Sequence, residues 1–175
     1  MIIIEVLLKF LIALKKSNIV EVILGLQLAV LSVVVFLQVL FRYVFNYPLA
    51  WTEELSRFLL IWIVLLGAAI GIKRKSHFSV DIVFKKFPEK LQQYLQFAID
   101  IFLFILIFDV MVLNGVYLTD LTLRQISPAL HIRVSYVYSA VLVGGILSCC
   151  YVLEDILLFI KGYWKKNLEK AIESK

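Results

Sequence analysis

Three charged side chains, Glu53, Glu54 and Arg57, stand together at the start of a strongly apolar run. The two carboxylates precede Arg57 by four and three residues, so on a helix either one can form an ion pair with the guanidinium. Catalysis or ion coupling would require a nucleophile, a metal ligand or a buried acid–base pair beside them, and the sequence supplies none. The spacing therefore predicts a paired charge cluster that braces a helix end. Asn46 is expected to cap this helix and Pro48 to lie in its first turn.

The histidines and cysteines do not form a pattern typical of a metal or redox site. Ligating haem inside a membrane requires histidines that face each other within a helix bundle, whereas His77 and His131 both fall between apolar runs. No HxxxH, HExxH or Cys/His cluster is present. Cys149 and Cys150 are adjacent within an apolar run, where we expect them to pack as small apolar residues. The sequence therefore predicts no cofactor and no enzymatic activity.

Acidic residues inside the apolar runs are the remaining candidates for chemistry. Asp109 lies deep within its run, where an unpaired carboxylate is costly. We therefore expect it to pair with a cation or a hydrogen-bond donor, either on this chain or on a partner. A proton relay is the alternative, although no second acid accompanies Asp109 at that depth. The other acids lie near the ends of the runs, where water and lysines can reach them: Glu21, Asp100, Glu154 and Asp155.

The composition indicates which solvent surrounds these residues. The chain has 175 residues, of which 62% are hydrophobic and 18% are charged, and its mean hydropathy is +0.95. A soluble domain is typically about 45–50% apolar and about 25% charged. We therefore predict an integral membrane protein surrounded by lipid. The net charge of +5 is explained by basic connections between membrane spans, so no nucleic-acid partner is expected.

Four apolar runs are long enough to cross a membrane, which needs about 20 residues of helix. The predicted spans cover residues 19–41, 49–72, 91–117 and 134–160. Residues 1–18 combine an apolar stripe with interrupting charges, which favours an amphipathic helix lying at the membrane surface. The alternative is an extended or disordered start of the first span. The fold class is therefore an all-α membrane protein, with residues 1–175 forming one domain.

The lysines and arginines predict the orientation of the spans. They concentrate before the first span, between the second and third, and after the fourth, while the other two connections carry only Arg42, Arg124 and Arg133. With four spans, all three basic segments fall on the same side of the membrane. The positive-inside rule then places both termini in the cytoplasm.

Small residues spaced four apart predict where helices approach closely. Such sets are Gly67 and Gly71 in the second span, Ala140, Gly144 and Ser148 in the fourth, and Gly25 and Ala29, followed by Ser32, in the first. No inverted repeat and no pair of broken helices is visible in the sequence. A chain without these features is poorly equipped to transport a solute alone.

Three segments resemble a known family. The segment FRYVFNYPLAWTEELSR (Phe41–Arg57) resembles the signature of the small membrane subunit of tripartite ATP-independent periplasmic (TRAP) transporters, the DctQ-like family. GAAIGIKRKSHFSVDIVFKKFP (Gly67–Pro88) is similar to the basic loop of that family, and SPALHIRVSYVYSAVLVGG (Ser127–Gly145) to the entry into its last helix. The resemblance extends, in matching order, over roughly residues 20–160.

The resemblance implies a function within a larger assembly. Members of this family have four spanning helices and a membrane-surface helix, and they bind a larger, DctM-like membrane subunit in the bacterial inner membrane. That subunit holds the substrate and sodium sites and moves as an elevator, so sodium is expected there and not in this chain. A DctP-like periplasmic protein captures a carboxylate-bearing solute such as sialic acid or a C4-dicarboxylate. The small subunit is then a non-catalytic scaffold that supports docking and uptake, embedded in membrane lipids.

Two sets of candidate residues follow from the topology and the resemblance. The candidates for contact with the large subunit are Glu53, Glu54, Arg57, Gly67, Gly71 and Asp109, and those for docking of the periplasmic protein are Arg42, Tyr47, Trp51, Arg124 and Arg133. A rival hypothesis is a stand-alone four-helix exporter of small molecules. That class needs a coupling glutamate near the middle of a helix, whereas Glu53 and Glu54 lie at an end.

Overall fold

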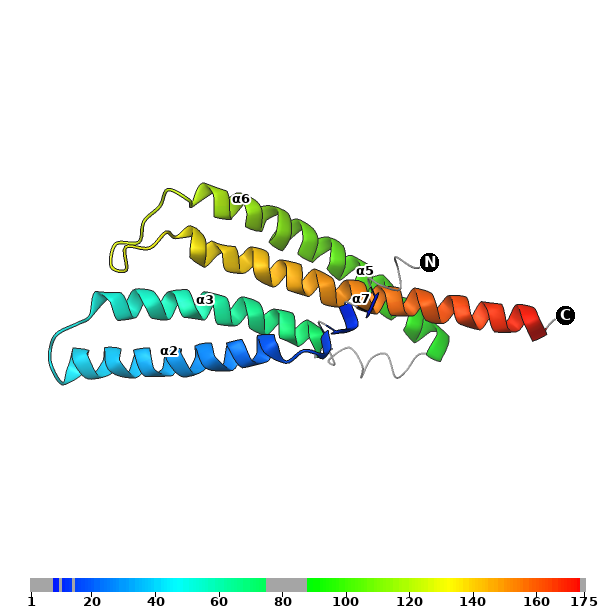
Figure 1. Cartoon of the computed structure of the whole chain (residues 1–175), viewed down its shortest axis with the longest axis horizontal. Helices are drawn as coiled ribbons and strands as arrows, with labels where there is room; N and C mark the ends of the chain where they lie inside the picture. Colours follow the sequence, from blue (N-terminus) through cyan, green and yellow to red (C-terminus); the bar gives the residue numbers. More distant parts are fainter. Residues whose placement is uncertain (1–7, 10, 14, 75–87, 174–175) are drawn as a thin grey trace.

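The computed structural model describes residues 8–9, 11–13, 15–74 and 88–173, and within them four long helical rods lie side by side (Figure 1). The rods are α2 (Ile19–Tyr43), α3 (Ala50–Lys73), a composite third rod of α5 (Glu89–Ile107), η2 (Phe108–Leu113) and α6 (Asn114–Leu121), and α7 (Ser135–Glu173). Each rod is long and apolar enough to cross a membrane. The predicted all-α architecture with four spans is therefore confirmed.

Most ends of the rods lie within a few residues of the predicted spans, and the end of α7 is the exception. The third span continues to Leu121, beyond the predicted end at residue 117, because polar side chains there bond within the helix. The Thr119 hydroxyl donates to the Gly115 carbonyl (2.7 Å), and the Thr122 hydroxyl donates to the Leu118 carbonyl (2.7 Å). Helix α7 runs on to Glu173, past the predicted boundary at residue 160.

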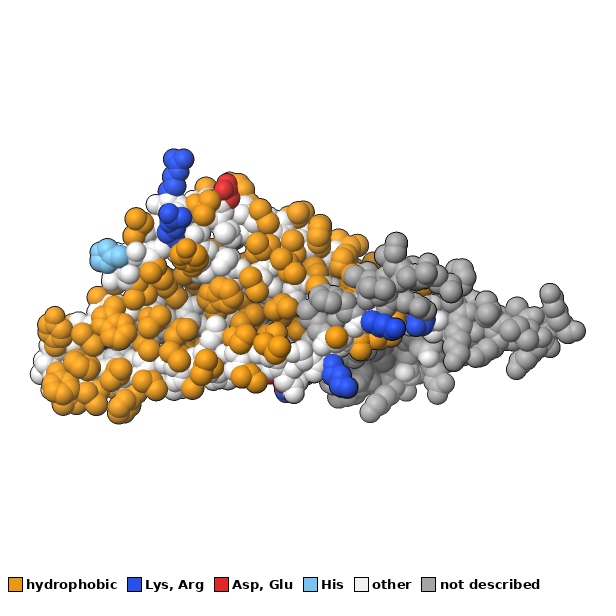
Figure 2. Space-filling model, viewed as in Figure 1, with side chains coloured by type: hydrophobic (Ala, Val, Ile, Leu, Met, Phe, Trp, Pro, Cys, Tyr) orange, Lys and Arg blue, Asp and Glu red, His pale blue; other side chains and the backbone are white. Residues whose placement is uncertain are grey.

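The four rods form a row rather than a closed bundle. Helix α2 packs on α3, α3 packs on α7, and α7 packs along the whole composite rod of α5, η2 and α6. Of the two inner helices, α3 and α7, α7 is the most buried span of the row, and α2 at one edge is the least buried. On the face shown in Figure 2, hydrophobic side chains cover most of the described surface, as expected for a surface that contacts lipid or another membrane protein.

The contact between α3 and α7 uses one predicted set of small residues. Ala140 and Ser148 are buried, and Gly144 lies so close to α3 that a Cβ added there would be 3.2 Å from the Leu65 carbonyl oxygen. The Trp62 indole N–H donates to the Tyr136 carbonyl (3.2 Å) across the same contact. Because Gly144 carries no side chain, the two backbones can approach closely.

Two other glycines, Gly115 and Gly145, hold the third rod against α7. A Cβ at Gly145 would lie 2.7 Å from the Met111 Cβ and 3.1 Å from its backbone carbonyl carbon, and one at Gly115 would lie 3.0 Å from the Leu142 nitrogen. Neither position was identified from the sequence. By contrast, a Cβ added at Gly71 or Gly25 would meet no atom of another element within 4 Å, and one at Gly67 would meet only the end of a leucine side chain at 4.0 Å.

The third rod contains one wide π-helical turn, η2, which the sequence did not predict. The backbone N–H of Asn114 bonds to the Asp109 carbonyl, and the Asn114 side-chain amide donates to the same oxygen (2.9 Å). A π turn adds a residue to a helical turn and shifts the helix faces beyond it. Here it keeps Ile107, Met111 and Gly115 on the side that faces α7.

The start of α3 differs from the prediction. The helix begins at Ala50 with Leu49 as its N-cap residue and no capping side chain. Asn46 is not the cap, because it adopts a left-handed backbone conformation (φ 51°) in the turn before the helix, a conformation that asparagine tolerates. Pro48 precedes the helix rather than lying in its first turn. The Thr52 hydroxyl instead closes this end by donating to the Leu49 carbonyl (2.6 Å).

The described part of the N-terminal segment is helical at residues 8–9, 11–13 and 15–16. Leu8 and Leu11 are buried, while Lys9 and Ile12 are exposed. The amphipathic character of the whole segment and its placement at the membrane surface stay predictions. Most of the predicted basic connection, residues 75–87 with His77, lies outside the described residues.

Candidate functional site

The turn 44–49 and the loop 122–134 lie at the same end of the row, which is called the loop end below (Figure 1). At this end Arg57 donates to the Glu53 carboxylate (3.0 Å), with side chains 64% and 66% exposed. This pair has the predicted i,i+4 spacing. Because it is exposed, it contributes little to the stability of the chain itself.

Glu54 has a different role from Glu53. Its Oε2 accepts hydrogen bonds from the backbone N–H groups of Ala129 and Leu130, both at 2.9 Å. The carboxylate thus holds the loop before α7 to the start of α3, across 75 residues of sequence. Only Glu53 forms the ion pair with Arg57. The predicted cluster therefore consists of an exposed ion pair, Glu53–Arg57, and a second carboxylate, Glu54, that bonds to the loop; the bonds of Glu54 to Ala129 and Leu130 are called the Glu54 clamp below.

The clamped loop is a short hairpin. Ile126 and Arg133 form a β-bridge, the Ser127 N–H donates to the Ile132 carbonyl (2.9 Å), and the Val134 N–H donates to the Gln125 carbonyl (3.0 Å). His131 turns the chain with a left-handed backbone (φ 57°). These bonds define the path of the loop backbone, and with it the points from which its exposed side chains project.

The five predicted docking residues are all exposed at the loop end. Tyr47 and Trp51 lie at the α2–α3 connection, and Arg124 and Arg133 belong to the clamped loop. The Arg42 guanidinium carbon lies 5.8 Å from the centre of the Tyr43 ring, a cation–π contact. The row therefore presents three arginines and two amphipathic aromatic residues at one end, without burying any of them inside the chain.

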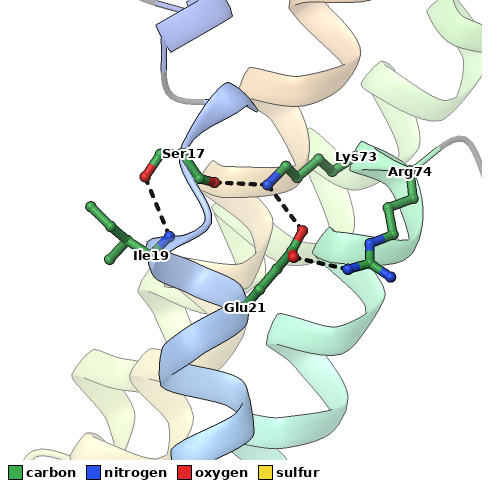
Figure 3. Close-up of polar contacts among 5 residues, drawn as sticks. All are labelled: Ser17, Ile19, Glu21, Lys73 and Arg74. Carbon is green, nitrogen blue, oxygen red and sulfur yellow. Dashed lines mark hydrogen bonds and ion pairs between the residues drawn. The ribbon is translucent and has the colours of Figure 1, made fainter.

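The opposite end, where α2 begins and α3 ends, is called the terminal end (Figure 1). There Glu21 accepts from Lys73 (3.1 Å) and from Arg74 (2.8 Å), and Lys73 also donates to the Ser17 carbonyl (2.8 Å), as Figure 3 shows. The pKa of the Arg74 guanidinium is raised above its ordinary value, first by this hydrogen bond and then by the Glu21 charge. The cluster joins the first two spans.

A second tie at the terminal end joins the N-terminal segment to α7. Lys15 lies 2.9 Å from Asp155 and 3.7 Å from Glu154, and all three side chains are largely buried. The expectation that lysines reach the acids near the span ends is correct for Glu21, Glu154 and Asp155. Asp100 accepts from the Gln96 amide (2.9 Å). These bonds explain how the acids are tolerated near lipid.

Asp109 is placed differently from these acids. It is exposed on the surface of η2, and among the described residues no side chain donates to its carboxylate. Of the other predicted contact residues, Gly67 is half-buried beside α2. A Cβ added at Gly71 would meet no atom of another element within 4 Å. The described residues contain no group of three potential metal-ligating side chains of the His, Cys, Asp or Glu type.

These features define a class: a multi-pass helical membrane protein whose charged groups are used at helix ends and for contacts between segments. The model of the family "Tripartite ATP-independent periplasmic transporters, DctQ component" matches residues 31–162. The chain belongs to this family. Its members are transport components of the inner membrane and not enzymes.

Curated relatives agree with this assignment. The chain is 31% identical to the sialic acid TRAP transporter small permease protein SiaQ of Vibrio cholerae, over 83% of each chain. It is 31% identical to the C4-dicarboxylate TRAP transporter small permease protein DctQ of the same species, over 41% of this chain and 33% of that protein. It is also 31% identical to part of the isethionate TRAP transporter permease protein DctMQ of Oleidesulfovibrio alaskensis, over 74% of this chain and 21% of that protein.

Proposed function

We propose that this chain is the non-catalytic scaffold subunit of a sodium-driven TRAP transporter that imports an organic acid anion. In this proposal a larger membrane subunit holds the substrate and the sodium ions. The small subunit widens the immobile part of the transporter and helps the periplasmic binding protein to dock at the loop end.

The observation that carries the proposal is the row of helices. A solute pathway needs a space enclosed by several helices and lined by polar groups. In the described part of the chain, each helix packs on its neighbours in a line, and the ion pairs lie at the two ends. Such a row offers two broad apolar faces to another membrane protein, which suits a scaffold.

The relatives support the proposal that this chain binds a larger membrane subunit. In the DctMQ permease, the region similar to this chain makes up 21% of one longer polypeptide, so a DctQ-like region and a larger permease region are covalently joined there. A separate small chain would make the same contact without a covalent link. The named relatives carry sialic acid, C4-dicarboxylate and isethionate, all organic anions, and the same chemical class is proposed here.

The loop end supports a docking role. It combines three exposed arginines with Tyr47 and Trp51, and aromatic and arginine side chains are enriched in protein interfaces. The Glu54 clamp holds two of those arginines, Arg124 and Arg133, on a loop of fixed shape. A preorganised surface loses less entropy on binding.

Reconstitution tests the proposal. Proteoliposomes should take up sialic acid or succinate only when they contain both membrane chains, when the binding protein is added outside, and when a sodium gradient points inward. Removing any one component should reduce uptake to background. Uptake by this chain alone would contradict the proposal and support the stand-alone exporter.

Replacing Arg57 with alanine should affect assembly more than the fold. An exposed i,i+4 pair contributes roughly 0.3–0.5 kcal/mol to a helix, so the unfolding temperature of the purified chain should change little. Recovery of the large subunit with the tagged small chain should decrease, because Glu53 would lose its counter-charge at a contact that excludes water. Normal recovery together with a changed substrate KM would contradict this prediction.

A further inference from the structure

Asp109 has an unusual environment for a carboxylate. It lies in the middle part of the Leu91–Leu121 span, and it is exposed on the outside of η2. Exposed apolar side chains surround its position along the rod: Phe102, Ile105, Val110, Leu113 and Val116. A charged carboxylate in such a setting is strongly disfavoured if lipid covers it.

The packing of the third rod fixes the direction of Asp109. Ile107 is buried, and Met111 contacts Gly145 of α7. Asp109 lies two residues from each of them, which in a helix is roughly 200° around the axis from Ile107. The side that carries Asp109 is therefore opposite to α7. Two bonds from Asn114 to the Asp109 carbonyl hold this turn in place.

Among the described residues, no basic side chain forms an ion pair with Asp109. The span that contains Asp109 has no lysine or arginine. In the other described spans, Arg57 is bonded to Glu53 and Lys73 to Glu21, and Lys161 lies at the end of the Ser135–Gly162 span. Arg42 stands at the end of α2, which packs on α3 at the far side of the row.

The remaining acids of the spans show how this protein treats carboxylates near lipid. Glu21, Glu53, Glu54, Asp100, Glu154 and Asp155 each have a partner within the chain, and Asp120 is exposed at the very end of its span, within reach of water. Asp109 departs from this pattern at a depth where a missing partner costs most. We therefore expect a positively charged group of another molecule to lie beside the Asp109 carboxylate.

We propose that Asp109 accepts a charge-assisted hydrogen bond, within the membrane, from a basic side chain of the larger permease subunit, and that the outer face of η2 is part of the subunit interface. An arginine suits the position best, because a guanidinium keeps its charge in a poorly hydrated site and binds a carboxylate with two parallel bonds. This inference rests on the proposed function, since it names the contact through which the small subunit binds its partner.

Co-purification of the two membrane subunits tests the contact. Asp109→Leu and Asp109→Asn should each lower the amount of large subunit recovered with the tagged small chain by about tenfold, the change that corresponds to 1.4 kcal/mol. Asp109→Glu should retain most of the recovery, because it keeps the carboxylate. Asp120→Asn is the matched control, an exposed acid near the end of the same span, and it should behave as the wild type. Unchanged or increased recovery with Asp109→Leu would overturn the proposal.

A photo-cross-linking residue at Leu113 gives a second measurement that leaves Asp109 intact. Leu113 is 52% exposed and lies next to Asp109 on η2. Irradiation of the complex should yield an adduct with the mass of both subunits. An adduct of two small chains, or labelling of lipid only, would overturn the proposal.

The outcomes separate this inference from the proposed function. If the wild-type chain does not co-purify with a larger permease subunit, the proposed function fails. If the wild type co-purifies, the Asp109 variants do so equally well and Leu113 gives no adduct, only the η2 interface fails.

Discussion

Replacing Gly145 with alanine should destabilise the chain by about 1–3 kcal/mol, the usual cost of overpacking a close contact. The new Cβ would lie 2.7 Å from the Met111 Cβ and 3.1 Å from its backbone carbonyl carbon. Because those atoms belong to or adjoin the backbone, no side-chain rotation relieves the clash. The apparent unfolding temperature of the purified chain in mild detergent should fall by several degrees.

Gly25→Ala is the matched control for this measurement. Gly25 lies within α2 and has no atom within 4 Å of an added Cβ. The same substitution there relieves the low helix propensity of glycine, worth up to about 1 kcal/mol. It should therefore leave the unfolding temperature unchanged or raise it slightly. Equal unfolding temperatures for the two variants would show that the third rod does not pack on α7 as described.

Replacing Glu54 with alanine should release the loop 122–134. The amides of Ala129 and Leu130 would lose their common acceptor, and the opening of such bonds controls how fast an amide exchanges with water. Deuterium uptake by a peptide that covers the loop should become about tenfold faster. Glu54→Gln should have an intermediate effect, because its side-chain carbonyl still accepts one or both bonds.

Glu53→Gln provides the control for the Glu54 prediction. Glu53 is adjacent in sequence and carries the same charge, but it bonds to Arg57 and not to the loop. Exchange in the loop should therefore match the wild type. Identical uptake in the Glu53 and Glu54 variants would mean that the hairpin bonds, and not the carboxylate, determine the shape of the loop.

The four spans could be predicted because the bilayer imposes a simple length requirement on an apolar helix. The resemblance carried by Phe41–Arg57 correctly identified the family. The row arrangement could not be predicted in the same way, since apolar periodicity does not distinguish a side chain that faces lipid from one that faces another helix.

The packing glycines illustrate this limit. Spacing correctly predicted Gly144 as a contact residue, but it ranked Gly67 and Gly71 equally, and within this chain they have no close neighbour. Gly115 and Gly145 were missed because each is a single small residue that fits one particular partner. A motif of small residues shows that a helix can pack closely on another helix. Whether it does so depends on the side chains of that second helix.

The charged residues show a second limit. The ion pair between Glu53 and Arg57 was predictable because its partners lie one turn apart. The Glu54 clamp and the tie from Lys15 to Asp155 join residues 75 and 140 positions apart, so local spacing carries no information about them. The π turn at Asp109 was not predicted, because helix propensity does not indicate where an extra residue enters a helical turn.

The two ties at the terminal end also set an order for biogenesis. Glu21 and Lys73 are 52 residues apart, so the first helical hairpin can neutralise its own buried charges as soon as its second helix has been synthesised. Lys15 finds Asp155 only across 140 residues, after the last helix has entered the bilayer. Contacts that distant in sequence form late. We therefore expect the contact from Lys15 to α7 to form after the contacts between the first two helices.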